Sequence, residues 1–141
     1  MLDLGAGTGA LTVPLAATGA RVIAVELHPV RARALREAVC GNVKVVEADA
    51  AVMALPRRPF RVVANPPFSI STSIIRHLTS RGSALVGADV LLPWYLTKRW
   101  LDVRHGEWIS SAGLRVPARA FTPLAPDGVT VLRLRRGGRG L

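Results

Sequence analysis

A glycine-rich loop near the start of the chain constrains the fold more than any other feature. Gly5-Ala6-Gly7-Thr8-Gly9 follows the short apolar segment 1–4 and precedes a stretch with helical character. Because glycine has no Cβ, a turn of this composition lets the backbone pass close to a ligand. Such a loop between a strand and a helix is typical of α/β proteins that bind nucleotide-like cofactors. The loop alone does not say which cofactor is bound.

Strand-like and helix-like patterns alternate along the chain, which predicts an α/β fold with a mostly parallel, twisted sheet and helices on both faces. The last two strands are expected to form an antiparallel edge. Strands are predicted at 1–4, 21–26, 42–47, 60–64, 84–92, 108–116 and 128–135, and helices at 10–18, 29–40, 69–78 and 94–103. Gly19 is expected to cap the first helix, and Pro14 either to kink this helix or to delay its start. Four apolar residues recur at helical spacing in the second helix: Val30, Ala34, Leu35 and Ala38.

The length of 141 residues predicts a single domain that spans residues 1–141. The first strand has four residues before its glycine turn, whereas a strand usually has about 5–6. We therefore expect this strand to be clipped ahead of Gly5. The arginine- and glycine-rich segment 133–141 is expected to be a mobile basic tail.

The net charge of +10 is distributed unevenly along the chain. Residues 1–52 carry five basic and five acidic side chains, whereas residues 53–141 carry fourteen basic and four acidic ones. One explanation for the excess of basic residues is a genome composition that favours arginine over lysine, since Lys44 and Lys98 are the only lysines. A polyanionic partner that meets the second half is the other explanation, and it accounts for the asymmetry.

Several classes of protein are disfavoured by the sequence. Cys40 is the only cysteine, so an intrachain disulfide is impossible, and no Cys/His spacing resembles a metal site. The uncharged segment 4–20 follows Asp3 and is interrupted by glycines and Pro14, so we do not expect a signal peptide. No segment is long and apolar enough for a membrane span. We expect a cytoplasmic monomer without a metal ion.

Two acidic residues at strand ends extend the candidate cofactor site. Glu26 follows Gly5 by 21 positions, close to the spacing of about 20 residues expected of an acid that holds a ribose diol. The same spacing fits a nicotinamide dinucleotide, because Gly5, Gly7 and Ala10 also satisfy that fingerprint. Asp49 ends the third predicted strand, and its carboxylate can accept a hydrogen bond from an adenine amino group. This acid favours an adenosyl cofactor over the dinucleotide.

The segment Asn65-Pro66-Pro67-Phe68, directly after the strand 60–64, indicates the chemistry. The exocyclic amino nitrogen of adenine is a weak nucleophile, because its lone pair is delocalised into the ring. Hydrogen-bond acceptors on its two N–H groups can rehybridise and aim it, and we expect the Asn65 side chain and the Pro66 carbonyl to do so. The two prolines hold these acceptors rigidly. Phe68 offers a face on which an extruded base can stack.

These motifs resemble the rRNA adenine-N6 dimethyltransferase superfamily, and within it the erythromycin-resistance (Erm) methyltransferases of 23S rRNA. The resemblance is carried by DLGAGTGALT (3–12), AVELHP (24–29), EADA (47–50), VVANPPF (62–68) and PARAFTP (117–123). It implies a Rossmann-like class I fold, S-adenosyl-L-methionine as cofactor, and methylation of an adenine N6 in 23S rRNA. Such methylation confers resistance to macrolides, lincosamides and streptogramin B.

The resemblance also implies roles for individual residues. The expected cofactor-binding residues are Asp3, Gly5, Ala6, Gly7, Gly9, Glu26, Leu27, Asp49, Ala50 and Asn65. The expected catalytic residues are Asn65, Pro66 and Phe68. Basic residues expected to contact RNA are Arg57, Arg58, Arg76 and Arg81, thought to flank the catalytic turn, together with Lys98 and Arg99. Aromatic residues near Lys98 and Arg99 suggest a platform for single-stranded RNA, although packing of Trp94 and Trp100 against the sheet is the simpler interpretation.

The chain also departs from the pattern of this family. Pro66 stands where the family more often has isoleucine or leucine, and proline there is also found in DNA adenine methyltransferases. We also expect this sequence to lack the family's upstream segment and its small helical C-terminal domain. Three alternatives therefore stay open: methylation of adenine in 16S rRNA or DNA, an inactive RNA-binding relic, and a nicotinamide enzyme.

Overall fold

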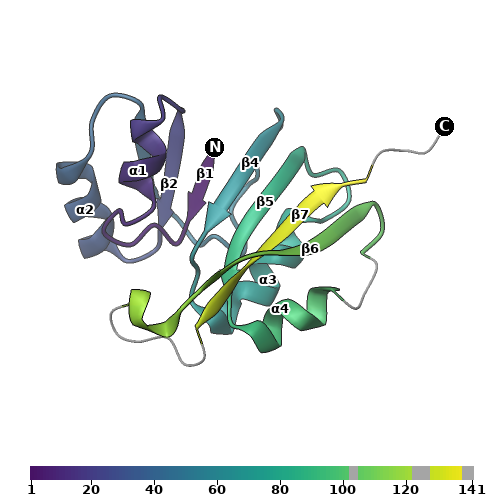
Figure 1. Ribbon diagram of the computed structural model, residues 1–141. Helices are drawn as coiled ribbons and strands as arrows, with labels where there is room; N and C mark the ends of the chain where they lie inside the picture. The colour runs from purple at the N-terminus through teal and green to yellow at the C-terminus, as the bar shows by residue number, and fades with distance from the viewer. Residues whose placement is uncertain (102–104, 122–127, 138–141) are drawn as a thin grey trace.

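The computed structural model describes residues 1–101, 105–121 and 128–137. Strands and helices alternate as far as α4, except between β3 and β4, where the described chain has no helix. The elements are β1 (Leu2–Leu4), α1 (Thr12–Ala17), β2 (Val22–Glu26), α2 (Pro29–Ala38), β3 (Val43–Glu47), β4 (Phe60–Ala64), α3 (Phe68–Leu78), β5 (Leu85–Leu92), α4 (Trp94–Leu101), β6 (Trp108–Val116), the 3₁₀ turn η1 (Ala118–Ala120) and β7 (Val129–Arg136). Figure 1 shows their arrangement.

The strands form one sheet in the order β3-β2-β1-β4-β5-β7-β6. Strands β1 to β5 are parallel, and β7 lies between β5 and β6 and runs antiparallel to both (Figure 1). Leu4, the last residue of β1, is paired with Val25 on one side and with Ala64 on the other. The carboxyl ends of β1, β2 and β4 therefore meet at one edge, next to the point where the strand order reverses. Ligands of open α/β sheets bind at such edges.

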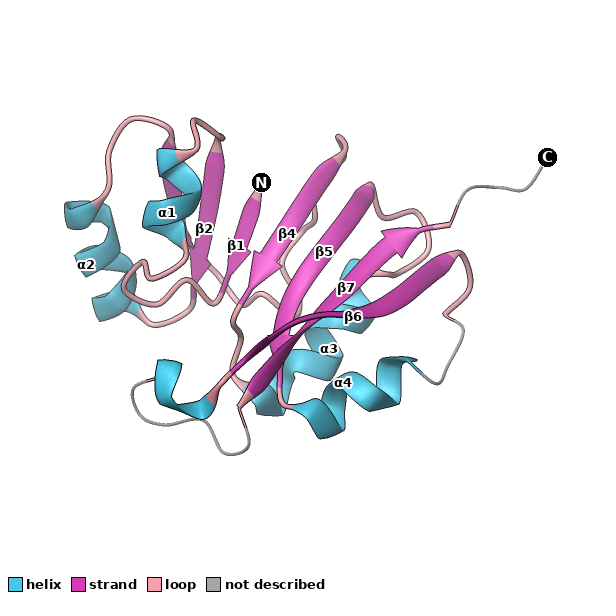
Figure 2. Cartoon of the chain, in the orientation of Figure 1, coloured by secondary structure: helices cyan, strands magenta, loops and turns pink. Residues whose placement is uncertain are grey.

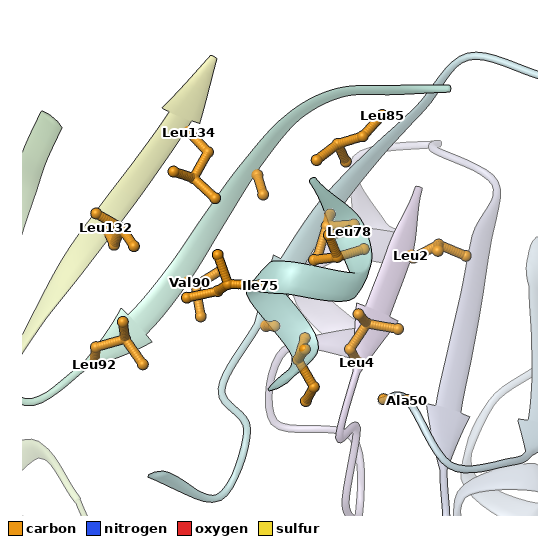
Figure 3. Packing of buried hydrophobic residues seen from close by; sticks show 14 of the residues in the cluster. Leu2, Leu4, Ala50, Ile75, Leu78, Leu85, Val90, Leu92, Leu132 and Leu134 are labelled. Carbon is orange, nitrogen blue, oxygen red and sulfur yellow. The ribbon is translucent and has the colours of Figure 1, made fainter. Parts of the chain in front are cut away.

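Apolar packing holds helices against both faces of the sheet (Figure 2). On one face, Ile74, Ile75 and Leu78 of α3 are fully buried in the larger core cluster, which includes Leu4 and Val90 (Figure 3). Leu96 and Trp100 of α4 join the same cluster. On the other face, α2 packs through Leu35 in a smaller cluster with Ala6 and Ala24. The predicted fold class, including the antiparallel strands at one side of the sheet, is confirmed.

Most predicted elements are present, and the start of the first helix was anticipated. β4 and β6 have the predicted bounds. α1 begins at Thr12 rather than at residue 10, so Pro14 lies in the first helical turn, where its missing N–H costs least. Gly19 follows the helix with φ of 84°, in the left-handed region expected of a C-terminal cap.

The helix predicted from Val30, Ala34, Leu35 and Ala38 is present as α2; its exposed side carries Val30, Ala34 and Ala38, whereas Ala32 and Leu35 are buried. One prediction about local structure was wrong. Residues 133–136, assigned to a mobile tail, form the end of β7 and are paired with β5 or β6. The remainder of that predicted tail, residues 138–141, lies outside the described residues.

Candidate active site

A cavity of about 600 Å³ opens at the carboxyl edge of β1, β2, β3 and β4. Its volume is that of a typical small-molecule site. The cavity brings together most of the residues predicted to bind the cofactor or to catalyse the reaction. Those that line it are Gly5, Gly7, Glu26, Leu27, Asp49, Ala50, Asn65, Pro66 and Phe68.

The glycine loop comes close to the turn Asn65-Pro66-Pro67-Phe68 at Gly5; this turn, whose residues were predicted to be catalytic, is called the catalytic turn below. This residue has φ of 73°, a left-handed conformation that disfavours any side chain. A Cβ built at Gly5 would lie 3.4 Å from the Cα of Pro66 and 3.8 Å from the carbonyl oxygen of Asn65. The loop after β1 and the turn after β4 therefore form one continuous wall of the cavity.

Glu26 holds together the part of the cavity wall that is formed by the glycine loop and by the segment after β2. Its Oε2 accepts a hydrogen bond of 2.7 Å from the amide of Gly7, and its Oε1 accepts one of 2.9 Å from the amide of His28. The residue is 6% exposed and still lines the cavity. Since each carboxylate oxygen has two acceptor sites, both can accept a further hydrogen bond from a ligand hydroxyl. This is the donor–acceptor pattern expected for a ribose diol.

Asp49, Leu27 and Ala50 form the region of the cavity expected to hold a planar base. Asp49 Oδ1 accepts a hydrogen bond of 2.9 Å from the amide of Ala51, which orients the carboxylate near the start of the loop after β3. Leu27 and Ala50 add apolar surface from the loops after β2 and β3. An acidic acceptor beside apolar side chains suits the amino edge and the faces of an adenine ring.

The catalytic turn is held from both ends. Asn65 follows the last residue of β4, and Pro67 occupies the N-cap position of α3 with φ of −52° and ψ of 132°. Pro66 is buried and Asn65 is exposed. Phe68, the first residue of α3, packs partly on the core, and its carbonyl oxygen accepts a hydrogen bond of 2.8 Å from Ser71 Oγ. The Asn65 side chain therefore stands on a rigid support at the cavity wall.

Three predicted cofactor residues do not line this cavity. Ala6 is 7% exposed and packs with Ala24 and Leu35 in the smaller core cluster. A Cβ at Gly9 would meet the side chain of Leu35 at 2.8 Å, so this glycine allows close packing of the loop on α2. Asp3 is 1% exposed. In this structure these three residues pack beneath the glycine loop and support its conformation.

Asp3 lies in an unusual environment. Its Oδ2 accepts a hydrogen bond of 2.6 Å from Thr12 Oγ1, whereas its Oδ1 is buried with no partner among the described residues. Burial raises the pKa of the Asp3 carboxyl above its ordinary value of 3.8; the Thr12 hydrogen bond acts in the opposite direction and the nearby charge of Glu26 adds to the rise. An unpartnered buried oxygen beneath a glycine loop fits a site completed by a ligand with a donor group.

Other lining residues were not predicted. They are Val25, His28, Pro29, Arg31, Ala48, Pro67, Ile70 and Ile74. His28, Pro29 and Arg31 belong to the segment just after Glu26, and their position was visible in the sequence, because the residues that follow a ligand-binding acid at a strand end face the same cavity. Ile70 and Ile74 recur at helical spacing after Phe68, which places them on one side of α3.

The predicted RNA-contacting residues are in two places. Arg57 and Arg58 precede β4, so the five residues of that strand separate them from Asn65 by about 17 Å. Arg76 and Arg81 are at or beyond the last turn of α3, an 11-residue helix about 16 Å long that starts beside the turn. The expectation that these four arginines flank the catalytic turn was wrong, and their contact with RNA stays a prediction. Lys98 and Arg99 are exposed on α4.

Two further observations concern the described residues alone. They contain no group of three or more His, Cys, Asp or Glu side chains arranged to hold a metal ion. None of their helices combines the length and apolar character that a bilayer crossing requires.

The sheet order, the cavity at its carboxyl edge and the glycine loop define a Rossmann-like, class I S-adenosylmethionine-dependent methyltransferase fold. A sequence profile described as ribosomal RNA adenine dimethylase matches residues 1–126. The chain belongs to this family. The family membership inferred from the sequence motifs is therefore confirmed.

Three known proteins illustrate the similarity. An rRNA adenine N-6-methyltransferase of Corynebacterium diphtheriae is 31% identical over 98% of this chain and 58% of the relative. Ribosomal RNA small subunit methyltransferase A of Leifsonia xyli subsp. xyli is 37% identical, over 65% of this chain and 36% of the relative. The crystal structure of the 23S rRNA methyltransferase ErmE superposes with a TM-score of 0.85 at 25% identity, covering 97% of this chain and 61% of that one. The chain thus spans between 36% and 61% of the length of these proteins.

Proposed function

We propose that this chain forms the catalytic part of an enzyme that transfers methyl groups from S-adenosyl-L-methionine to the exocyclic N6 of an adenine in 23S rRNA. The contact between Gly5 and Pro66 carries the proposal, because it places a cofactor loop and an amino-group-binding turn in the wall of one cavity. Methylation of this kind would protect the ribosome from macrolide, lincosamide and streptogramin B antibiotics.

The cavity fits the proposed cofactor. The carboxylate of Glu26 would accept hydrogen bonds from the ribose hydroxyls, and Asp49 would accept one from the adenine amino group. Leu27 and Ala50 would cover the faces of the adenine ring, and the unpartnered Oδ1 of Asp3 offers an acceptor behind the glycine loop. When bound, this cofactor supplies an electrophilic methyl group on a sulfonium sulfur.

The residues of the catalytic turn would prepare the target nitrogen. Asn65 Oδ1 and the Pro66 carbonyl would each accept one of the two N6 hydrogens, which draws the nitrogen out of conjugation and directs its lone pair at the methyl carbon. Pro66 and Pro67 keep these acceptors in place before the substrate arrives. Phe68 would stack on the extruded base, an interaction that contributes about 1–3 kcal/mol in comparable sites. The methylated nitrogen is acidic enough to release its proton to water.

The 23S target is favoured over the small-subunit target by the extent of the similarity. In sequence, the mycinamicin-resistance protein MyrB of Micromonospora griseorubida matches 96% of this chain at 31% identity, whereas the small-subunit enzyme matches 65% of it at 37% identity. In structure, ErmE superposes with a TM-score of 0.85, against 0.76 for a dimethyladenosine transferase of Plasmodium falciparum. The second candidate keeps the chemistry and changes the substrate to 16S rRNA or DNA, and Pro66 is the residue that keeps the DNA target open.

Radiolabelled methyl transfer to three substrates tests the proposal. Protein-free 23S rRNA, 30S particles and an adenine-containing DNA duplex are incubated with the chain and cofactor in parallel. Incorporation into 23S rRNA, found at N6 of adenine after nuclease digestion, is the expected result. Incorporation into DNA or 30S particles alone overturns the 23S assignment. Cofactor binding without transfer to any of the three would favour a relic that keeps the fold without turnover.

A further inference from the structure

The solvent-facing side of α4 carries two aromatic and two basic side chains: Trp94, Tyr95, Lys98 and Arg99. We propose that this α4 face binds a single-stranded segment of the RNA substrate that adjoins the target adenine. The inference rests on the function proposed above, since it names where that substrate is held.

Burial divides α4 into an inner and an outer side. Leu96, Thr97 and Trp100 are buried, and Trp100 also lies against the His105 ring with centroids 4.4 Å apart. Trp94 is 39% exposed and Tyr95 is 64% exposed. The core therefore uses Trp100 and leaves much of Trp94 and Tyr95 in water. Contiguous exposed apolar surface rimmed by polar residues is typical of interaction sites.

The outer side is also cationic. Trp94 and Lys98 are four positions apart, as are Tyr95 and Arg99, so that each aromatic ring has a basic side chain on the next helical turn. The helix sequence WYLTKRWL contains no acidic residue. A surface of this composition is complementary to a polyanion whose bases are free to stack, because the rings accept base faces while the cations accept phosphates.

The position of α4 connects this surface with the catalytic turn. In the register of β4 and β5, Ala64 is paired with Val90. Asn65 follows Ala64 at once, and α4 begins four residues after Val90, with Leu96 and Thr97 amides hydrogen-bonded to Pro93. Both elements therefore start at the carboxyl edge of neighbouring strands. The aromatic end of the α4 face is the end nearer to the site where the adenine would be extruded.

Base extrusion takes the target nucleotide out of its stack, which costs least where the base already lies in a single-stranded segment. Single-stranded RNA segments are commonly held by aromatic side chains on which bases stack and by arginine or lysine at the backbone. The α4 face offers both groups next to the site, whereas Arg57, Arg58, Arg76 and Arg81 are toward the opposite edge of the sheet. For this reason we assign the nucleotides that flank the adenine to α4.

Fluorescence anisotropy with a labelled RNA stem-loop that presents adenine in a single-stranded loop provides the test. Tyr95→Ala is expected to weaken binding about tenfold, and Tyr95→Phe to restore it to within about twofold, because the phenyl ring still stacks. The double variant Lys98→Gln/Arg99→Gln is expected to reduce the slope of log K against log salt by about 1.4, the value for two lost phosphate contacts on a single strand.

The matched control is the double variant Arg33→Gln/Arg36→Gln, which removes the same amount of charge from the exposed side of α2. It should leave the salt slope of RNA binding unchanged. All of these variants replace exposed side chains, so their thermal unfolding midpoints and their affinity for S-adenosylmethionine should match those of the unaltered chain.

The outcomes separate this inference from the function on which it rests. The α4 assignment is overturned if Tyr95→Ala leaves the RNA affinity unchanged and the Lys98/Arg99 double variant leaves the salt slope unchanged. Methyl transfer by the unaltered chain would in that case still uphold the proposed function. Failure of the unaltered chain to bind the stem-loop, with cofactor bound normally, overturns both. Binding to anionic phosphatidylserine vesicles in place of RNA would also contradict the α4 assignment, since the surface would then serve a membrane.

Discussion

Thr12 Oγ1 donates a hydrogen bond of 2.6 Å to Asp3 Oδ2 where both residues are closed to solvent. The hydroxyl at the start of α1 is thereby tied to the end of β1, directly beneath the glycine loop. Burial keeps the pKa of this carboxyl raised, even though the hydrogen bond from Thr12 lowers it. The stability of the glycine loop therefore depends on the Thr12 hydroxyl and, through the Asp3 carboxyl, on pH.

Replacing Thr12 by valine should destabilise the fold by about 1–3 kcal/mol, because Asp3 Oδ2 would be left buried without a donor. The pKa of Asp3 should also rise further. Urea unfolding at pH 7 measures the free energy change. Thr18→Val is the control, since the Thr18 hydroxyl donates to the Leu15 carbonyl at the exposed end of the same helix. Equal losses in the two variants would contradict the role given to Asp3.

The Asp3 carboxyl should make stability depend on pH in a defined direction. A carboxyl whose pKa is raised by folding stabilises the folded state below its ordinary pKa of 3.8 and loses that contribution as pH rises through the raised value. Asp3→Asn removes the titration and keeps an acceptor for Thr12. The free energy of unfolding of the unaltered chain minus that of Asp3→Asn should fall as pH rises from about 4. A difference that stays flat or increases would disprove the raised pKa.

Asn65→Ala should separate chemistry from cofactor binding. Removal of one acceptor for the N6 hydrogens is expected to lower kcat by at least about 10²-fold, the size of the effect of losing one preorganised hydrogen-bonding group. The dissociation constant of S-adenosylmethionine, measured by calorimetry, should change by less than about threefold, since Asn65 is exposed at the cavity wall. Loss of cofactor binding would assign Asn65 to the cofactor instead.

Glu26→Gln should weaken cofactor binding about tenfold or more. The glutamine side chain has one acceptor oxygen in place of two, so it must turn an NH₂ group toward the amide of Gly7, the amide of His28 or the ribose. The control is Glu47→Gln, because Glu47 is the residue paired with Glu26 in the sheet register and is exposed. Calorimetry should show no change for that variant, and equal weakening by both would point to a general electrostatic effect.

Gly5→Ala tests the contact between the loop and the turn. Alanine at φ of 73° is strained, and its Cβ would fill the space between the loop and the turn, 3.4 Å from the Cα of Pro66. Gly41→Ala provides the control, since Gly41 has φ of 67° and open space around its Cα. Both variants should lose about 1 kcal/mol of stability, and Gly5→Ala alone should lose methyl transfer. Full activity in folded Gly5→Ala would show that the contact is dispensable.

Sequence patterns predicted where strands and helices lie in the chain better than they predicted which side of each element is buried. β4 is bounded by prolines at 59 and 66, so its limits were visible in the sequence. In α2, the spacing of Val30 and Leu35 correctly indicated a helix, yet the buried side depends on which residues face β2 and β3. That orientation is a tertiary property, and small Ala32 was buried in place of larger Val30.

The candidate site was predicted where its residues are adjacent to strand ends. Gly5, Glu26, Asp49 and Asn65 each follow or end a parallel strand, so their convergence at one edge follows from the fold class. The prediction that Arg57 and Arg58 lie beside the catalytic turn was wrong for a different reason. Arg58 is seven positions from Asn65 in the sequence, but the intervening residues are extended as β4 and carry it to the other edge of the sheet.

β1 pairs with β2 on one side and β4 on the other, and it leads directly into the residue that packs on Pro66. Any displacement of the Gly5 backbone by a ligand must therefore be transmitted to the turn that would receive the adenine. By thermodynamic linkage, a change in RNA affinity caused by the cofactor would be matched by an equal change in cofactor affinity caused by RNA. The two ligands of this domain would then be cooperative through the close approach of one backbone segment to another.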